Sequence, residues 1–522
     1  MPATRRWRFG AATLYGYWLK TVMDPVRIRA LELDSMLDAC DRVLLHQPSL
    51  EEPGLTSLVL PLVAAARGIA CEVLVDEDAP ALEIPPTLGP PSREAGSATR
   101  LKAPLRKARR EWHRARSALT GPRTTRLTLL FVDFGYDLTY LLTRAREQGH
   151  RCLRVVGDTV VEEGPRGLEV GRLPVEGEAA DWVSAAEAVA APDHPLWAWP
   201  NGWLTGAPLA DVCRPHVLFW LSEVMPRIAA RAAAFESLLR SENVDLVLGA
   251  NIASPDVVAA AAVTAPPTQS VLIDHGHRAH ASELFDLILL RHVDHNFCWT
   301  GELARYMELR RALYDVPTAE IHVGSYQLGA TSTSRSGQPP EPLPDDRPVV
   351  VFALGATGGS RRYLNGPWFT DSWYYVLCRE IVDILARHPE VFSVVKLFPG
   401  DGLARNPIDL YVDDLGLDHV VWSRAPLRDW IPWADRVVFD YPSTGLYEVA
   451  AAGVPYLALL YGHHRYRPAA VEGLGLAAVR FTEPAEAAHA VEAFVAAPTA
   501  SAPRFAPEGE EILTALERVA GA

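Results

Sequence analysis

Residues 436–455 read RVVFDYPSTGLYEVAAAGVP, and this stretch decides the fold. Residues 436–439 have the composition of a short buried strand, and the run from Thr444 onward has that of a helix ending at Gly453. A strand that passes through a polar turn directly into a helix is typical of parallel sheets covered by helices. The stretch therefore predicts an α/β domain with a ligand site at the carboxyl end of this strand.

The turn between this strand and helix carries the groups that a phosphorylated ligand needs. Ser443 and Thr444 stand at the predicted helix start, where hydroxyls and unpaired backbone N–H groups can hold a phosphate against the positive end of the helix dipole. Glu448 follows one turn later, and its carboxylate can accept hydrogen bonds from ribose hydroxyls. The alternative interpretation is an ordinary Ser/Thr helix cap followed by a helical glutamate.

Outward from this stretch, the alternation of strands and helices continues through the C-terminal half. Further strands are predicted at residues 349–354, 392–397, 419–422 and 456–460. Residues 328–347 are rich in Ser, Thr, Gly and Pro and predict an exposed linker. We therefore expect a doubly wound, Rossmann-like C-terminal domain over residues 348–522.

The N-terminal half shows the same alternation. Strand–helix–strand units are predicted over residues 41–75 and 127–156, a long amphipathic helix over 216–240, and further strands at 244–248, 270–273, 294–299 and 319–323. A basic amphipathic helix over residues 101–119 lies within an insertion at 80–126. The fold class is thus α/β with two Rossmann-like doubly wound domains, the first over residues 1–327.

Three further loops after predicted C-terminal strands are candidates for donor contacts. The first contains Gly358 and Arg361, which combine close backbone approach with positive charge, although a tight turn has the same composition. Lys396 ends the second strand, where it either faces a phosphate or extends along the surface. Residues 463–465, His-His-Arg, follow the last predicted strand and either contact the donor or form a surface loop. The first loop, after residues 349–354, has neither the ending of a P-loop nor a dinucleotide fingerprint.

The stretch at 436–455 resembles the donor-site strand, turn and helix of GT-B glycosyltransferases. The resemblance rests on Ser443-Thr444-Gly445, Glu448, Ala451, Gly453 and Pro455. It implies two Rossmann-like domains that face each other across a cleft, with the nucleotide sugar held by the C-terminal domain and the acceptor by the N-terminal domain. It covers the linker and residues 348–495 and, more loosely, residues 127–327.

A narrower resemblance is to bacterial capsule and teichoic-acid transferases. His275-Gly276, after an N-domain strand, and Ser443-Thr444, at the start of the donor helix, match motifs of that group. Phe398 stands where the group has the histidine of a His-Pro motif, so that histidine's contact with phosphate or cytidine is not carried over. The resemblance implies transfer of a sugar or polyol phosphate from a nucleotide-activated donor to a surface-polysaccharide or lipid-linked acceptor. It implies no metal and no cofactor besides the nucleotide sugar.

Such a transfer needs a stabilised leaving phosphate and a base for the acceptor hydroxyl. The predicted helix start and the basic residues of the neighbouring loops would stabilise the leaving group. We expect His275 to be the base, with Asp133 and Asp137 as the other candidates. All three lie on loops at the carboxyl ends of predicted N-domain strands, where the cleft is expected.

Two other functions fit the same fold. A nucleotide-sugar 2-epimerase has a similar helix-opening serine and glutamate, but it would release free sugar and nucleotide without any acceptor. A catalytically silent scaffold or carbohydrate-binding protein would bind a nucleotide without turnover, an interpretation that Phe398 favours.

The composition of the 522-residue chain limits its partners and its location. A net charge of −14 argues against a protein that coats nucleic acid. The six cysteines show no zinc-type spacing, and no stretch reaches the roughly 20 apolar residues of a membrane span, so we expect a cytoplasmic protein. The basic helix at 101–119 either lies on anionic membrane near a lipid-linked acceptor or packs on its own acidic domain.

Overall fold

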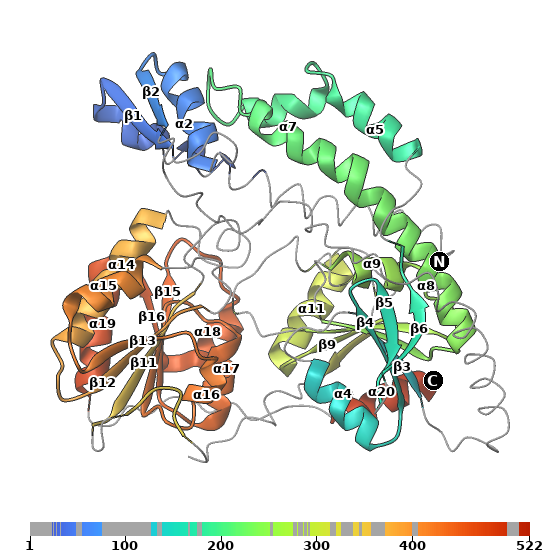
Figure 1. The fold of residues 1–522 in the computed structure, drawn as a ribbon. Helices are drawn as coiled ribbons and strands as arrows, with labels where there is room; N and C mark the ends of the chain where they lie inside the picture. The colour runs from blue at the N-terminus through green and yellow to red at the C-terminus, as the bar shows by residue number, and fades with distance from the viewer. Residues whose placement is uncertain are drawn as a thin grey trace.

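The computed structural model contains two large sheets and a small N-terminal unit (Figure 1). It describes residues 23–47 except 24, 25, 28 and 32; 55–75; 127–132; 138–174 except 165 and 166; 180–250; 254–274; 293–313; 320–324; 338–343; 347–355; 371–398; 406–497; 511–521; and 279, 286 and 290. The basic segment 101–119 and the insertion at 80–126 lie outside the described residues, as does most of the expected linker at 328–347.

The C-terminal sheet has six parallel strands in the order β13-β12-β11-β14-β15-β16. Their bounds are β11 Val349–Ala353, β12 Phe392–Lys396, β13 Val420–Ser423, β14 Arg436–Phe439, β15 Tyr456–Tyr461 and β16 Ala478–Phe481. The strands proceed outward from β11 first on one side and then on the other, which is the order of a Rossmann sheet. The predicted doubly wound domain is confirmed, and β16 is a strand that the sequence did not predict.

Helices cover both faces of this sheet. They are α14 Asp371–Ala386, α15 Pro407–Leu415, α16 Leu427–Trp430, α17 Thr444–Ala452, α18 Pro468–Leu474 and α19 Pro484–Ala496. Val350 and Phe352 of β11 enter one apolar core with α14 and α19, whereas Val351 enters another with α17 and α18. Alternate residues of a strand point to opposite faces, so a sheet buried on both faces needs continuously apolar strands.

The N-terminal sheet has eight strands in the order β10-β9-β8-β7-β3-β4-β5-β6. Their bounds are β3 Thr128–Phe131, β4 Arg151–Val156, β5 Thr159–Glu162, β6 Leu168–Arg172, β7 Leu246–Gly249, β8 Gln269–Ile273, β9 His295–Cys298 and β10 Glu320–Val323. All neighbours are parallel except β4–β5 and β5–β6. The sequence did not predict the antiparallel strands β5 and β6, which extend one edge of the sheet.

The predicted unit at 41–75 forms a separate small body. It consists of β1 Arg42–Gln47, α2 Leu55–Ala66 and β2 Ala70–Val75, whose strands pair with each other as a two-stranded sheet. Its core includes Val59 and Val63 of α2 together with residues of α5 Ala180–Ala190 and α7 Ala210–Phe219. The sequence predicts that this unit belongs to one Rossmann-like domain over 1–327. It is instead separate, because its apolar face is buried against helices and not against the large sheet.

One long helical run joins this small body to the large N-terminal sheet (Figure 1). The run comprises α7, the π-helical segment η3 Trp220–Val224 and α8 Met225–Glu242. Val212 and Val217 of α7 belong to the core of the small body, whereas Ile228 and Phe235 of α8 belong to the core of the large sheet. The helix predicted at 216–240 therefore begins earlier than expected and connects two cores.

Helix α20, Ile512–Gly521, returns to the N-terminal sheet. Its apolar residues Leu513 and Leu516 share a core with Leu129 of β3 and Leu138 of α4, the helix Leu138–Glu147. The expected C-terminal domain at 348–522 is therefore too long at its end, because the apolar face of α20 is buried on the other domain.

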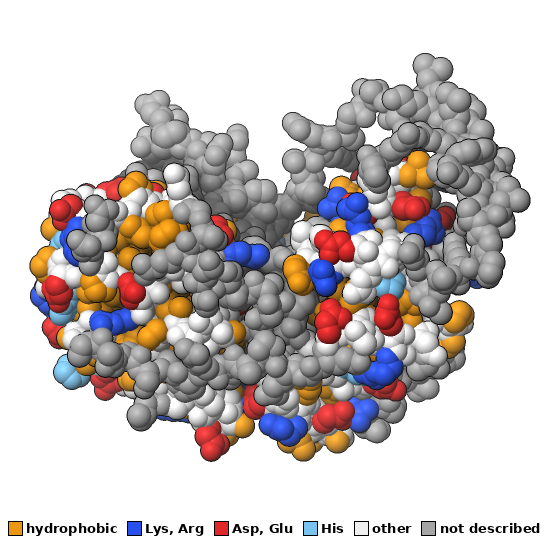
Figure 2. Space-filling view, turned by 90° about the horizontal axis from the view of Figure 1, so that it is seen from below, with side chains coloured by type: hydrophobic (Ala, Val, Ile, Leu, Met, Phe, Trp, Pro, Cys, Tyr) orange, Lys and Arg blue, Asp and Glu red, His pale blue; other side chains and the backbone are white. Residues whose placement is uncertain are grey.

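The described surface carries charges of both signs. On the face shown in Figure 2, acidic and basic side chains of the described residues are interspersed. Among the helices of the described part of the chain, none is long and apolar enough to cross a membrane.

Candidate functional site

The candidate site lies where the C-terminal sheet changes its winding direction. β11 and β14 are neighbours, but the chain passes from β11 to β12 on one side and from β14 to β15 on the other. Doubly wound sheets bind ligands in the crevice at the carboxyl ends of such diverging strands. The residues there are Leu354 and Gly355 after β11, and Asp440 to Ser443 after β14.

Asp440 joins the two strand ends at this switch point. Its carboxylate accepts a hydrogen bond of 2.7 Å from the Gly355 N–H and another from the Tyr374 hydroxyl of α14. The residue is 2% exposed, and this burial raises the pKa of Asp440 to about 6, while its hydrogen bonds act in the opposite direction. A Cβ on Gly355 would lie 2.8 Å from the Tyr441 ring, so only glycine fits here.

We expect Asp440→Asn to change the pH dependence of stability. A carboxyl whose pKa is raised by folding binds more protons in the native than in the unfolded state, so its contribution to stability falls as pH rises from about 4 to about 6. The amide cannot ionise. Relative to wild type, the variant should therefore gain about 2–3 kcal/mol between pH 4 and pH 7.5, whatever constant cost the amide adds.

Thermal unfolding of both proteins across this pH range measures the effect. The surface variant Asp429→Asn on α16 controls for loss of a negative charge. Parallel Tm curves for wild type and Asp440→Asn would contradict the prediction.

Helix α17 begins beside this carboxylate with a serine that does not cap it. Ser443 is the N-cap residue in extended conformation (φ −93°, ψ 177°), and its side chain makes no capping hydrogen bond. Its N–H donates to the Tyr441 carbonyl at 2.9 Å, and its carbonyl accepts from the Leu446 N–H at 3.1 Å. The ordinary serine cap, the alternative interpretation of the sequence, is therefore not what the structure contains. The geometry leaves the first turn of α17 without a cap from Ser443, as an anion site requires.

Glu448 lies one turn into α17, near two basic side chains. Burial raises the pKa of Glu448, and the positive charges of Arg428 on α16 and Lys396 at the end of β12 lower it in part. Lys396 is 6% exposed, so it does not extend along the surface. Lys396 and Glu448, which were both predicted as donor contacts, therefore lie close enough to interact electrostatically. Arg428 also interacts with Glu448, and the sequence did not single it out.

The loop after β15 closes another side of the switch point. Burial raises the pKa of the Tyr466 hydroxyl, and the nearby negative charge of Asp440 raises it further. His464 contacts the Tyr461 and Tyr466 rings at centroid distances of 5.7 and 5.9 Å. Burial lowers the pKa of His464 to about 4, so its imidazole is neutral at physiological pH. Of the predicted His-His-Arg loop, His463 and Arg465 are exposed.

Arg467, at the end of this loop, contacts the N-terminal domain. Its guanidinium donates two hydrogen bonds to the carboxylate of Glu302 at the start of α11, Gly301–Leu313, at 3.0 and 2.8 Å. It also lies over the Tyr306 ring at 5.1 Å, and its backbone N–H donates to the Ala279 carbonyl at 2.8 Å. Arg467 is 2% exposed, so the ion pair is largely shielded from water.

The N-terminal side of this contact comes from the loops after β8 and β9. Trp299, directly after β9, is fully buried in a core made mainly of C-terminal residues, and its indole N–H donates to the Asp274 carbonyl at 2.5 Å. Asp274 directly follows β8. The carboxyl ends of β8 and β9 therefore face the carboxyl end of β15. This arrangement is the GT-B fold.

The described residues include four of the predicted site residues. Lys396, Ser443, Thr444 and Glu448 lie at the carboxyl edge of the C-terminal sheet, around the switch point. The remaining five lie outside the described residues: Asp133, Asp137, His275, Gly358 and Arg361. Asp274, directly before His275 in the sequence, and Ala279, further along the chain, both lie at the contact between the two domains.

The sequence did not single out three further residues of this region, Asp440, Arg467 and Glu302. Asp440 carried a usable signal, because an acidic residue directly after an apolar strand in a doubly wound sheet stands at the ligand edge. Arg467 and Glu302 carried none, because they are 165 residues apart in the chain and no local spacing rule joins them.

Comparisons with known proteins find similarity only among solved structures. No family model matches the chain, and no curated protein matches it. Among solved structures it is similar to MurG from Acinetobacter baumannii, with 11% identity, 71% of this chain and 90% of the other covered, and a TM-score of 0.36. It is also similar to UDP-GlcNAc 2-epimerase from Neisseria meningitidis bound to UDP-GlcNAc, with 11% identity, coverages of 72% and 92%, and a TM-score of 0.42.

A third similar structure is CalG4, the calicheamicin glycosyltransferase, with 18% identity, coverages of 72% and 91%, and a TM-score of 0.35. Similarities of this size say nothing about donor or acceptor. The fold assignment rests on the strand orders and on the facing carboxyl edges of the two sheets.

Proposed function

We propose that the chain is a glycosyltransferase that moves a sugar, or a related polyol phosphate, from a nucleotide-activated donor to a surface-polysaccharide or lipid-linked acceptor. The observation that carries the proposal is the start of α17 at the switch point, where the Ser443 side chain makes no capping hydrogen bond, with Glu448 and the buried Lys396 beside it. The motif at 436–455 and its resemblance to the donor site of GT-B glycosyltransferases agree with this position.

The geometry suits a nucleoside diphosphate or monophosphate. The first-turn N–H groups of α17 and the hydroxyls of Ser443 and Thr444 would bind the phosphate, where the positive end of the helix favours an anion. Lys396 would add positive charge as the phosphate leaves, and fixed charges of this kind stabilise a leaving group without reorganisation. Glu448 would accept hydrogen bonds from the ribose hydroxyls.

The acceptor would approach from the N-terminal domain. In the sequence, His275 directly follows Asp274, and both Asp274 and Ala279 lie at the domain contact, which supports His275 as the base, with Asp133 and Asp137 as the other candidates. For a lipid-linked acceptor we place the enzyme on the cytoplasmic side of the membrane, with the basic segment 101–119 as its contact with anionic lipid.

A binding screen tests the donor assignment. Thermal shifts of the full chain would be measured with UDP-, GDP-, dTDP-, CDP- and CMP-linked sugars. The sugars of one nucleotide should raise the Tm, because they bind preferentially to the native state. Incubation of the stabilising donor with and without envelope acceptors then separates the functions. Acceptor-dependent transfer supports the proposal, acceptor-free release of sugar and nucleotide indicates a 2-epimerase, and binding without turnover indicates a silent protein, as Phe398 suggests.

We expect Glu448→Ala to weaken nucleotide binding about 10- to 100-fold, since hydrogen bonds to a charged group contribute about 1.5–3 kcal/mol. Its Tm should not fall, because removing a carboxylate whose ionisation is disfavoured by burial removes a cost of folding. Isothermal titration with the nucleotide measures the effect. Glu472→Ala, at an exposed position of α18, is the matched control. An unchanged Kd for Glu448→Ala would refute the site assignment.

A further inference from the structure

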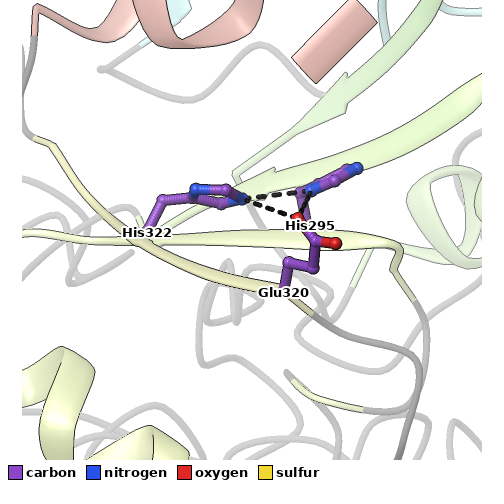
Figure 3. A group of neighbouring side chains, drawn as sticks. All are labelled: His295, Glu320 and His322. Atoms are coloured by element: carbon purple, nitrogen blue, oxygen red, sulfur yellow. Dashed lines mark hydrogen bonds and ion pairs between the residues drawn. The ribbon is translucent and has the colours of Figure 1, made fainter. Parts of the chain in front are cut away.

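Three potential metal ligands meet at the edge of the N-terminal sheet that lies away from the domain contact (Figure 3). His295 is the first residue of β9, and Glu320 and His322 lie on the same face of the neighbouring parallel strand β10. Strand pairing places Glu320 directly opposite His295. The group is therefore held by the backbone register of two strands and not by loops.

The separations between the ligand atoms suit one metal ion. His295 Nδ1 lies 3.1 Å from His322 Nε2 and 3.6 Å from Glu320 Oε2, and His322 Nε2 lies 3.9 Å from Glu320 Oε2. The point in their plane that is equidistant from the three atoms lies about 2.1 Å from each, which matches Zn–N and Zn–O bond lengths of about 2.0–2.2 Å. Two imidazoles and one carboxylate are a known zinc donor set.

Neighbouring side chains orient both imidazoles for metal binding. His295 Nε2 lies 3.0 Å from the Gln269 Oε1 acceptor, so this nitrogen carries the proton and Nδ1 presents its lone pair to the group. The His322 ring is stacked on Phe297 with centroids 4.7 Å apart, which fixes its orientation.

We propose that His295, Glu320 and His322 bind a single Zn²⁺ ion that fastens the edge strand β10 to β9. Three protein ligands leave one position for water, which can enter because the Glu320 side chain is 70% exposed. The site lies at the amino ends of the strands, whereas the candidate active site lies at their carboxyl ends. The ion therefore stabilises the edge of the sheet and takes no part in sugar transfer.

The test uses the full chain without a polyhistidine tag, treated with a chelator and then titrated with Zn²⁺ against a chromophoric competitor. We expect one equivalent to bind, confirmed by elemental analysis after dialysis. Saturation should raise the Tm by about 5 °C when free Zn²⁺ exceeds the Kd about 100-fold. Co²⁺ in the same site should give the visible absorption bands of a tetrahedral nitrogen and oxygen environment.

His322→Asn should weaken Zn²⁺ binding about 100-fold or more and abolish the Co²⁺ bands, because it removes a direct ligand. Glu320→Gln removes the only charged ligand from an exposed position, so it tests the site even if His322→Asn misfolds. The matched control is His388→Asn, which disrupts a histidine–glutamate pair on the other domain (His388 Nδ1 to Glu390 Oε1, 2.6 Å) and should leave binding unchanged.

Two outcomes would overturn the proposal. Absence of stoichiometric Zn²⁺ binding would mean that the group is only a hydrogen-bonded histidine pair beside a carboxylate. Binding that survives both ligand substitutions would place the ion elsewhere. Nucleotide binding is measured in parallel and should not change in either variant, so failure here is distinguishable from failure of the proposed function.

Discussion

Arg467→Met is expected to destabilise the contact between the two domains by about 3 kcal/mol, the order of loss seen when one partner of a buried ion pair is removed. The substitution leaves the Glu302 carboxylate, 20% exposed, without the guanidinium that holds both of its oxygens. It also removes one of the two guanidinium groups that lie over the Tyr306 ring, whereas that of Arg310 remains. The two domains should then unfold in separate transitions, the first at a lower temperature than in wild type.

Differential scanning calorimetry measures the transitions, and small-angle X-ray scattering reports whether the native domains separate. Arg465→Met is the matched control, because Arg465 is exposed two residues earlier in the same loop. The double variant Arg467→Met/Glu302→Met should recover much of the loss, since replacing a buried pair by apolar residues is often neutral. A single unchanged transition in Arg467→Met would show that this ion pair does not hold the domains together.

His275→Ala is expected to lower turnover about 10²- to 10⁴-fold while leaving the Kd for the nucleotide unchanged, because a general base acts only in the transition state. The assignment rests on the resemblance of His275-Gly276 to the transferase motif and on the positions of Asp274 and Ala279 at the domain contact. Wild-type kcat/KM should rise with pH through one ionisation and then level off.

Steady-state kinetics with the donor and acceptor found in the binding screen measure this effect. His277→Ala, in the same loop, is the matched control and should keep most of the activity. If His275→Ala retains wild-type turnover, Asp133→Asn and Asp137→Asn become the next variants. A loss of nucleotide affinity in His275→Ala would show instead that this residue binds the donor.

The sequence predicted those elements whose signals are local. The strand β14 and the helix α17 lie where the motif placed them, and Gly453 ends the helix with φ +72°, a conformation that favours glycine. Gly68 and Gly149 end their helices in the same way. The strand bounds of the C-terminal sheet agree within one or two residues, because continuous apolar runs between helices are a strong pattern.

The remaining errors concern contacts between distant segments. Nothing in residues 41–75 distinguishes a separate two-stranded sheet from two strands of a large sheet. The difference depends on which helices, distant in the sequence, pack on the strands. The same applies to α20, whose apolar face fits either domain. The antiparallel pair β4–β5 turns at Gly157, whose φ of +57° marks the turn, but the short strands β5 and β6 carry little apolar pattern.

The candidate site was predicted where chemistry is encoded in consecutive residues. Ser443, Thr444 and Glu448 follow from a strand, a turn and a helix in direct succession. Arg467 with Glu302, and His295 with His322, are pairs made by the tertiary structure. Their partners come from separate strands or domains, and no spacing rule for a single element joins them.

The placement of α20 bears on how the protein is made. Residues 512–521 leave the ribosome only after the whole C-terminal sheet has been synthesised, yet Leu513 and Leu516 complete the core beside β3 and α4. During translation of the second half, the first domain therefore exposes an apolar groove that its own missing helix will later fill. Chaperones that recognise such surfaces have time to bind, because the core of the first domain is completed only after the second domain has been synthesised.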